Sequence, residues 1–132
     1  MEILLKKTGD TPQDYDGRRY LIESTWPENV QDWDLGPYRW VQELVPSCEL
    51  IAAAQKHRWH HDQVQRLYWA ELEQPKAQAA LQQLLAENQD GHVTFLYGGD
   101  DGLKSYAASL RKYITTHGAA LAKVPEPLLL AA

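Results

Sequence analysis

The chain has 132 residues, of which 44% are hydrophobic and 23% are charged. This length fits one domain, and the apolar share is sufficient for a core and excludes wholesale disorder. The net charge is −5 and no basic stripe is present, which disfavours duplex DNA as a partner because phosphate neutralisation supplies most of that affinity. No apolar run approaches the ~20 residues of a membrane helix, and residues 1–10 lack the regions of a signal peptide. We expect neither duplex nucleic acid nor a membrane as a partner.

Cys48 is the only cysteine, which excludes an internal disulfide and fits a reducing compartment, so we expect a cytoplasmic protein.

Two short apolar runs near the start predict strands, Glu2–Lys7 and residues 19–25. The link between them, residues 8–17, is rich in turn residues and holds no predicted helix, so antiparallel pairing of the first run is easier than parallel pairing. Residues 38–45 predict about two helical turns, which Pro46 ends.

Capping residues mark the starts of the next helices. Ser47 suits the N-cap of a helix that begins at Cys48. The spacing of apolar residues predicts an amphipathic helix over residues 62–74, and Pro75 suits the first position of another.

The last third predicts a strand, a turn and a helix. Residues 93–97 form a continuous apolar run typical of a strand that is buried on both faces. Residues 98–102 predict a turn, and residues 105–117 predict a helix that ends at Gly118. Residues 119–132 form a C-terminal tail, either flexible or docking.

Together these elements predict an α/β fold with a small, mostly parallel sheet of about three strands, flanked by about five helices in three layers. We expect one domain over residues 1–118. Ligands of such sheets bind beyond the carboxyl ends of the strands, which here means residues 23–26 and 98–104.

Four motifs carry a family resemblance. They are RYLIESTWPEN (19–29), LVPSCEL (44–50), LYWAEL (67–72) and VTFLYGGDD (93–101). In order and spacing they resemble the domain of unknown function 488 family, the bacterial YeaO-like proteins. The family motifs read approximately R-V-L-V-D-R-L-W-P-R-G, L-A-P-S-T-E-L, R-Y-x-x-E-L and V-T-L-L-Y-A-A-x-D. The resemblance spans residues 2–114 and implies the family's fold.

The chain departs from the family at charged positions. Glu23 keeps the family's carboxylate, but Ser24 stands where the family has arginine, and Glu28 replaces a second arginine. Lys104-Ser105-Tyr106 replaces a His-Asn-His motif. Because arginine binds anions and histidine transfers protons at neutral pH, the resemblance implies a divergent member that has lost most of its site chemistry.

Glu23 and Asp101 are the candidate catalytic residues. They either face each other across the mouth of the sheet, as an acid–base pair or a magnesium site, or serve local structure. In the second case Glu23 pairs with Arg18, Arg19 or Lys104, and Asp101 is an ordinary turn residue. The candidate ligand-binding residues are Ser24, Trp26, Lys104 and Ser105.

Other clusters have a simpler interpretation. His57, His60 and His61 would share one helical face, but they lack a fourth ligand, so we expect solvated surface and no metal site. We expect Cys48 to be a small packed side chain rather than a nucleophile. Trp33 and Trp59 either form an exposed aromatic contact or, as we expect, are partly buried.

Three functions remain open. The leading hypothesis is binding of a small ligand or a partner protein at the carboxyl ends of the strands. The alternative is an enzyme for a small polar or phosphorylated substrate, possibly metal-assisted, that uses Glu23 and Asp101. The third is a structural subunit that acts through an aromatic patch or the tail. The sequence identifies no cofactor and no oligomeric state.

Overall fold

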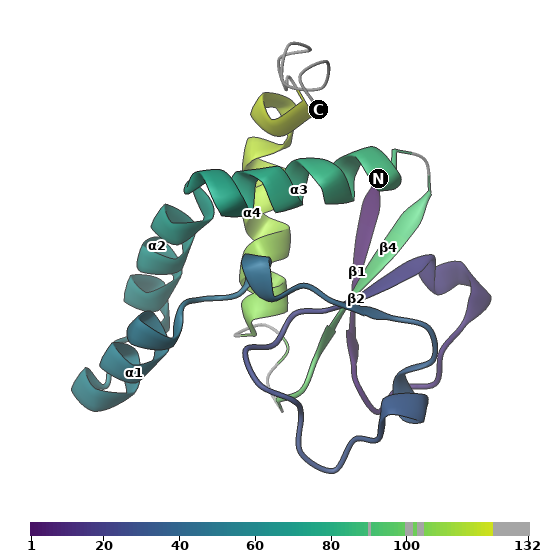
Figure 1. Ribbon diagram of the computed structural model, residues 1–132, viewed down its shortest axis with the longest axis horizontal. Coiled ribbons are helices and arrows are strands. Elements are labelled where there is room, and N and C mark those ends of the chain that lie inside the picture. Colours follow the sequence, from purple (N-terminus) through teal and green to yellow (C-terminus); the bar gives the residue numbers. More distant parts are fainter. Residues whose placement is uncertain (90, 100–101, 103–104, 123–132) are drawn as a thin grey trace.

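The computed structural model describes residues 1–89, 91–99, 102 and 105–122, with the backbone alone for 119–122. The described residues form one sheet of four strands in the order β1-β4-β2-β3, and every pairing is parallel (Figure 1). The strands are β1 (Glu2–Lys7), β2 (Arg18–Leu21), β3 (Arg39–Trp40) and β4 (His92–Tyr97). The predicted α/β class with a small parallel sheet is confirmed.

Four α-helices occur in the described part of the chain. They are α1 (Cys48–His57), α2 (His61–Leu72), α3 (Pro75–Glu87) and α4 (Tyr106–Ala122). The Ser47 hydroxyl accepts a hydrogen bond from the Leu50 amide and caps α1, and Pro75 is the first residue of α3, both as predicted. Gly118 does not end α4, which continues to Ala122. No helix within the described ranges has the length and apolar character that a membrane crossing requires.

The prediction of antiparallel pairing for β1 is wrong. β4 lies between β1 and β2, so the chain must return across β4 before β2 begins. Ten extended residues reach up to ~33 Å, so residues 8–17, which include a short 3₁₀ helix (Asp14–Asp16), are long enough to make this return without an α-helix. The Thr94 hydroxyl of β4 donates to the Asp16 carbonyl at 2.8 Å and holds the returning segment against the sheet.

Gly17 marks the closest approach of this returning segment to β4. Its φ is +66°, and a Cβ at this position would lie 1.9 Å from the carbonyl oxygen of His92. Only glycine fits here.

The two helical turns predicted at residues 38–45 are absent. Trp40 instead pairs with Leu21, and the Val41 amide donates to the Leu21 carbonyl at 3.3 Å, so the segment adds an edge strand to the sheet. A single 3₁₀ turn (Gln42–Leu44) follows. Backbone pairing with β2 therefore overrides the local helical pattern.

The helices cover one face of the sheet, and loops cover the other. The large core joins Tyr20 and Phe95 of the sheet to apolar residues of α2, α3 and α4. On the opposite face Leu21 and Leu96 pack against Leu35 and against half-buried side chains of residues 26–40. The predicted three layers are therefore two layers with a loop cover.

Candidate functional site

Glu23 and Gly98 meet at the carboxyl ends of β2 and β4. The Ile22 amide donates to the Leu96 carbonyl at 3.0 Å, which extends the pairing of the two strands by one residue. Beyond it, the Gly98 amide donates to Oε1 of Glu23 at 2.9 Å. This hydrogen bond joins two segments that are 75 residues apart in sequence, at the carboxyl ends of the strands, where ligands of parallel sheets bind.

A cavity of about 400 Å³ opens beside this hydrogen bond. Its described lining residues are Glu23, Thr25, Trp26, Pro27, Glu28, Gly98, Gly99, Ser105 and Tyr106. A Cβ on Gly98 would lie 2.9 Å from the Pro27 ring, so a glycine at this position allows the loop after β2 to lie directly on the end of β4.

The Glu23 carboxyl group is half-buried, and burial raises its pKa above the ordinary value of 4.5. The hydrogen bond from Gly98 opposes this shift because it favours the charged form. Burial and the nearby Glu23 charge also raise the pKa of Tyr106. The carboxyl and phenol groups therefore share one poorly solvated corner of the cavity.

The predicted alternative pairing of Glu23 with Arg18 or Arg19 does not occur. Arg18 and Arg19 lie at the start of β2 and pair with Glu87 and Asp16, respectively. Within the described ranges, the Gly98 amide is the hydrogen-bond donor to the Glu23 side chain.

Trp26 and Trp40 fix the loop that carries Glu23. The Trp40 indole donates to the backbone carbonyl of Glu23 at 2.6 Å, and the Trp26 indole donates to the Val30 carbonyl at 2.7 Å. The two indole rings lie 5.6 Å apart, edge to face. Both tryptophans are half-buried, and their contacts hold one wall of the cavity in place.

The other candidate residues have different positions. Ser105 lines the cavity, but its hydroxyl donates to the Gly102 carbonyl and accepts from the Ala108 amide, so it serves the start of α4. Ser24 is half-buried and is not among the lining residues. Asp101 and Lys104 lie outside the described residues. Our sequence reasoning interpreted Gly98 as part of a turn and Tyr106 as an inward-facing residue of the last helix, and it proposed neither as a site residue.

The three histidines do not share a helical face. His57 ends α1, Arg58 adopts a left-handed conformation (φ 52°), and Nδ1 of His60 caps α2 by accepting from the Asp62 amide. The chain turns between the two helices, so the expected spacing is broken. Among the described residues, no group of three or more His, Cys, Asp or Glu side chains is arranged to hold a metal ion.

Three further predictions concern single side chains. Cys48 is exposed rather than packed. Trp33 is 76% exposed, contrary to the expected partial burial. Trp59 is half-buried against the main core, as expected.

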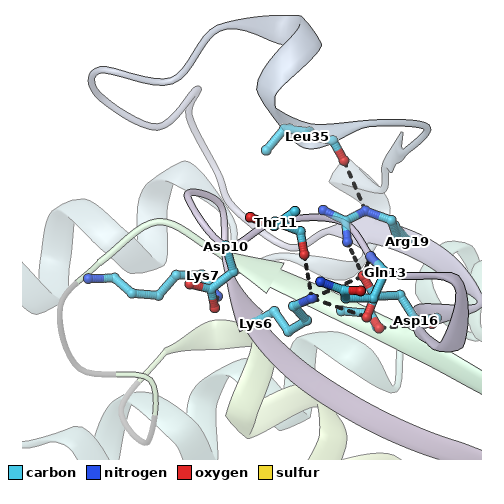
Figure 2. A network of polar contacts seen from close by, with 9 residues as sticks. Lys6, Lys7, Asp10, Thr11, Gln13, Asp16, Arg19 and Leu35 are labelled. Atoms are coloured by element: carbon cyan, nitrogen blue, oxygen red, sulfur yellow. Dashed lines mark hydrogen bonds and ion pairs between the residues drawn. The ribbon is translucent and has the colours of Figure 1, made fainter.

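Our sequence reasoning missed a buried ionic network on the loop-covered side of the sheet (Figure 2). The Asp16 carboxylate accepts hydrogen bonds from Nζ of Lys6 at 3.2 Å, from the Gln13 amide at 3.0 Å and from Nη1 of Arg19. Nε of Arg19 donates to the Leu35 carbonyl at 2.9 Å. The network ties residues 8–17 and 31–36 to β1 and β2.

Burial opposes the charge on Asp16, but the hydrogen bonds and the two cations outweigh it, so the pKa of Asp16 falls below its ordinary value of 3.8. The available sequence signal was the presence of Lys6 and Arg19 inside short apolar strands.

Residues 2–126 match the family profile described as "Inactive DUF488-N3 subclade". The chain belongs to the DUF488 family. It is similar to the uncharacterized protein YeaO of Escherichia coli (strain K12), with 27% identity over 114 residues that cover 86% of this chain and 97% of the relative. No solved structure matches.

The motif residues that this DUF488 protein retains hold the fold together. The Ser47 amide donates to Oε1 of Glu71 at 2.8 Å, and the Ser47 hydroxyl donates to the other oxygen of the same carboxylate. The buried Tyr68 hydroxyl donates to the Leu44 carbonyl. The retained motifs therefore join the start of α1 to α2, whereas three residues at changed family positions, Glu28, Ser105 and Tyr106, line the cavity beside Glu23.

Proposed function

We propose that this DUF488 protein binds a small ligand that carries N–H or O–H donors, at the carboxyl ends of β2 and β4, without catalysing a reaction there. The supporting observation is the Glu23 carboxyl group, which is half-buried at a 400 Å³ cavity and accepts one hydrogen bond from the described chain. A carboxylate in this position has acceptor capacity for a ligand that brings its own donors.

The charge of the cavity favours a neutral or cationic ligand over an anionic one. Glu23 and Glu28 both line the cavity, and its described lining residues include no lysine or arginine. Trp26 and Tyr106 add aromatic surface, which attracts cations and stacks on flat ligands. A small amine, a guanidinium compound or a nucleobase meets these requirements, whereas a phosphate would be repelled.

The binding role is supported over the enzymatic one by the residues at the changed family positions. Ser24 and Glu28 stand where the family has arginine, and Ser105 and Tyr106 stand where it has asparagine and histidine. The subclade that this chain matches is described as inactive. The alternative enzyme needs Asp101 opposite Glu23, and Asp101 lies outside the described residues.

A thermal-shift assay on the full chain tests this proposal. The probes are methylguanidine, putrescine, adenosine and cytosine, each titrated to saturation. A probe at about one hundred times its dissociation constant stabilises by about 2.7 kcal/mol, a shift of several degrees for a domain of this size.

Glu23→Gln is the diagnostic variant because it keeps an oxygen acceptor for the Gly98 amide and removes the charge. Glu49→Gln, at an exposed position on α1, is the matched control. We expect the shift to disappear in Glu23→Gln and to remain in Glu49→Gln. The proposal is wrong if none of the four probes stabilises the protein, or if Glu23→Gln responds as strongly as the unmodified chain.

A further inference from the structure

A second cavity, of about 560 Å³, lies at the opposite ends of the strands, beside the amino ends of β2 and β3. Its lining includes Arg18, Arg19 and Arg39 together with Gln13, Tyr38 and Glu87. The cavity shares no lining residue with the one beside Glu23. It requires a separate explanation because the proposed function makes no use of it.

Parallel register brings two of the arginines together. Arg18 begins β2, Arg39 begins β3, and Arg39 pairs with Tyr20, two residues after Arg18. Both guanidinium groups reach Glu87, the last residue of α3. Nη1 of Arg39 donates to the Glu87 carboxylate at 3.1 Å, and Nη1 of Arg18 lies 3.9 Å from it.

The Glu87 carboxylate leaves several donors of both guanidinium groups unused. Nε and Nη2 of Arg39, and the side-chain nitrogens of Arg18, form no hydrogen bond with the described residues, although Nη1 of Arg18 is ion-paired with Glu87. The side chains of Arg18 and Arg39 are 59% and 56% exposed, whereas that of Glu87 is 21% exposed. Donors for an added anion are therefore accessible, and their present partner is mostly covered.

Arg19 lies beneath the same cavity and is paired with Asp16. Its side chain is buried, and its Nη2 has no acceptor in the described part of the chain. Three arginines and two acidic residues line the cavity, although the whole chain carries a net charge of −5. Because Asp16 neutralises Arg19, the positive charge that an anion can reach comes from Arg18 and Arg39, and two exposed guanidinium groups at one cavity favour recognition of negative charge.

We propose that this cavity binds a small ligand through a phosphate or carboxylate group, which is held by the guanidinium groups of Arg18 and Arg39. Planar guanidinium groups present paired N–H donors that match two oxygens of such an anion. The rest of the ligand would contact apolar walls, which are formed by the ring of Tyr38 and by Pro12 and Pro37.

Glu87 acts in this site as an internal competitor. A carboxylate at the last residue of a helix faces the negative end of the helix dipole, so it depends on its arginine partners. The ligand anion and Glu87 compete for the same donors of Arg39. Removal of the Glu87 charge is therefore expected to strengthen anion binding, the opposite of what a purely supporting residue would do.

Titration of the full chain by isothermal calorimetry, with inorganic phosphate, glucose 6-phosphate and glucose as probes, tests the proposal. We expect binding of the two phosphates and none of glucose. Arg39→Ala is expected to weaken phosphate binding about tenfold or more, because a charge-assisted bidentate contact is lost. Glu87→Gln is expected to tighten it several-fold, and Arg39→Lys is expected to lie between Arg39→Ala and the unmodified chain.

Two controls separate this site from general charge and from the proposed function. Arg66→Ala removes an exposed arginine on α2, and Glu23→Gln alters the other cavity, so neither is expected to change phosphate affinity. Equal affinity for the two phosphates shows recognition of the anion alone, and tighter glucose 6-phosphate binding shows contact with the apolar walls. Both results support the proposal. It is overturned if phosphate does not bind, if Arg66→Ala weakens binding as much as Arg39→Ala, or if Glu87→Gln weakens it.

Discussion

Removal of the buried Asp16 carboxylate is expected to cost a large part of the protein's stability. In Asp16→Ala, Nζ of Lys6, Nη1 of Arg19 and the Gln13 amide each lose an acceptor. The side chains of Arg19 and Lys6 are only 4% and 14% exposed, so water cannot replace the carboxylate without opening the loops. Leaving a buried charge without its partner costs about 3–5 kcal/mol. Since a domain of this kind has about 5–15 kcal/mol of stability, this loss is a large fraction of the total.

Urea denaturation followed by tryptophan fluorescence measures this loss. With an m-value of about 2 kcal/mol per molar urea, the midpoint is expected to fall by roughly 2 M. Asp14→Ala, an exposed aspartate in the same 3₁₀ turn (Asp14–Asp16), is the matched control and is expected to leave the midpoint almost unchanged. A loss below about 1 kcal/mol for Asp16→Ala, the range of an exposed ion pair, would refute the buried-charge reasoning.

The pH dependence of the same variant provides an independent check. The folded-state pKa of Asp16 is lower than its ordinary value of 3.8, so its contribution to stability is present above that value. The contribution is lost as the pH falls through the folded pKa. The difference in unfolding free energy between the unmodified chain and Asp16→Ala is therefore expected to be constant near neutral pH and to shrink in acid below pH 3.8. A difference that stays constant throughout the acid range would contradict this sign.

Three further predictions concern Glu23 and two glycines. The folded-state pKa of Glu23 lies above its ordinary value of 4.5, so protonated Glu23 favours folding below pH 4.5 and this contribution is lost as the pH rises through the folded pKa. Glu23→Gln should therefore become more stable relative to the unmodified chain as the pH rises over that interval. A decrease in its relative unfolding free energy in urea titrations would contradict this sign. Gly17→Ala should lower the free energy of unfolding by about 3 kcal/mol or more, because a Cβ there would overlap the His92 carbonyl and φ is positive. An almost unchanged urea midpoint would contradict the close approach. Gly118→Ala should raise the free energy of unfolding by about 0.5–1 kcal/mol, because residue 118 lies inside α4 and an added Cβ would meet nothing within 4 Å. A decrease in stability would show that the helix does not continue through this residue.

Local chemistry explains which elements the sequence predicted well. Ser47, Pro75 and the apolar run at residues 93–97 act through their own backbone or their immediate neighbours, so their roles were readable without the fold. The place of the candidate site also followed from a general property of parallel strands, and Glu23 lies there beside Gly98.

Other features depend on contacts between distant segments, which no local pattern contains. The direction of β1 is set by the position of β4 between β1 and β2, and residues 39–40 become a strand because β2 supplies a partner. The histidine spacing failed because Arg58 turns the chain between α1 and α2. Asp16 showed no special signal, because its importance comes from Lys6 and Arg19 on two different strands.

The most direct test of the proposed function is a titration of the ¹⁵N-labelled chain with methylguanidine, followed through the Gly98 amide and the Trp26 indole resonances. The Gly98 amide donates to the Glu23 carboxyl group, and the Trp26 side chain lines the same cavity, so both report on this site. The account predicts saturable shifts of both resonances that are lost in Glu23→Gln and kept in Glu49→Gln. Unchanged Gly98 and Trp26 resonances at saturating methylguanidine, or equal shifts in Glu23→Gln, would contradict it.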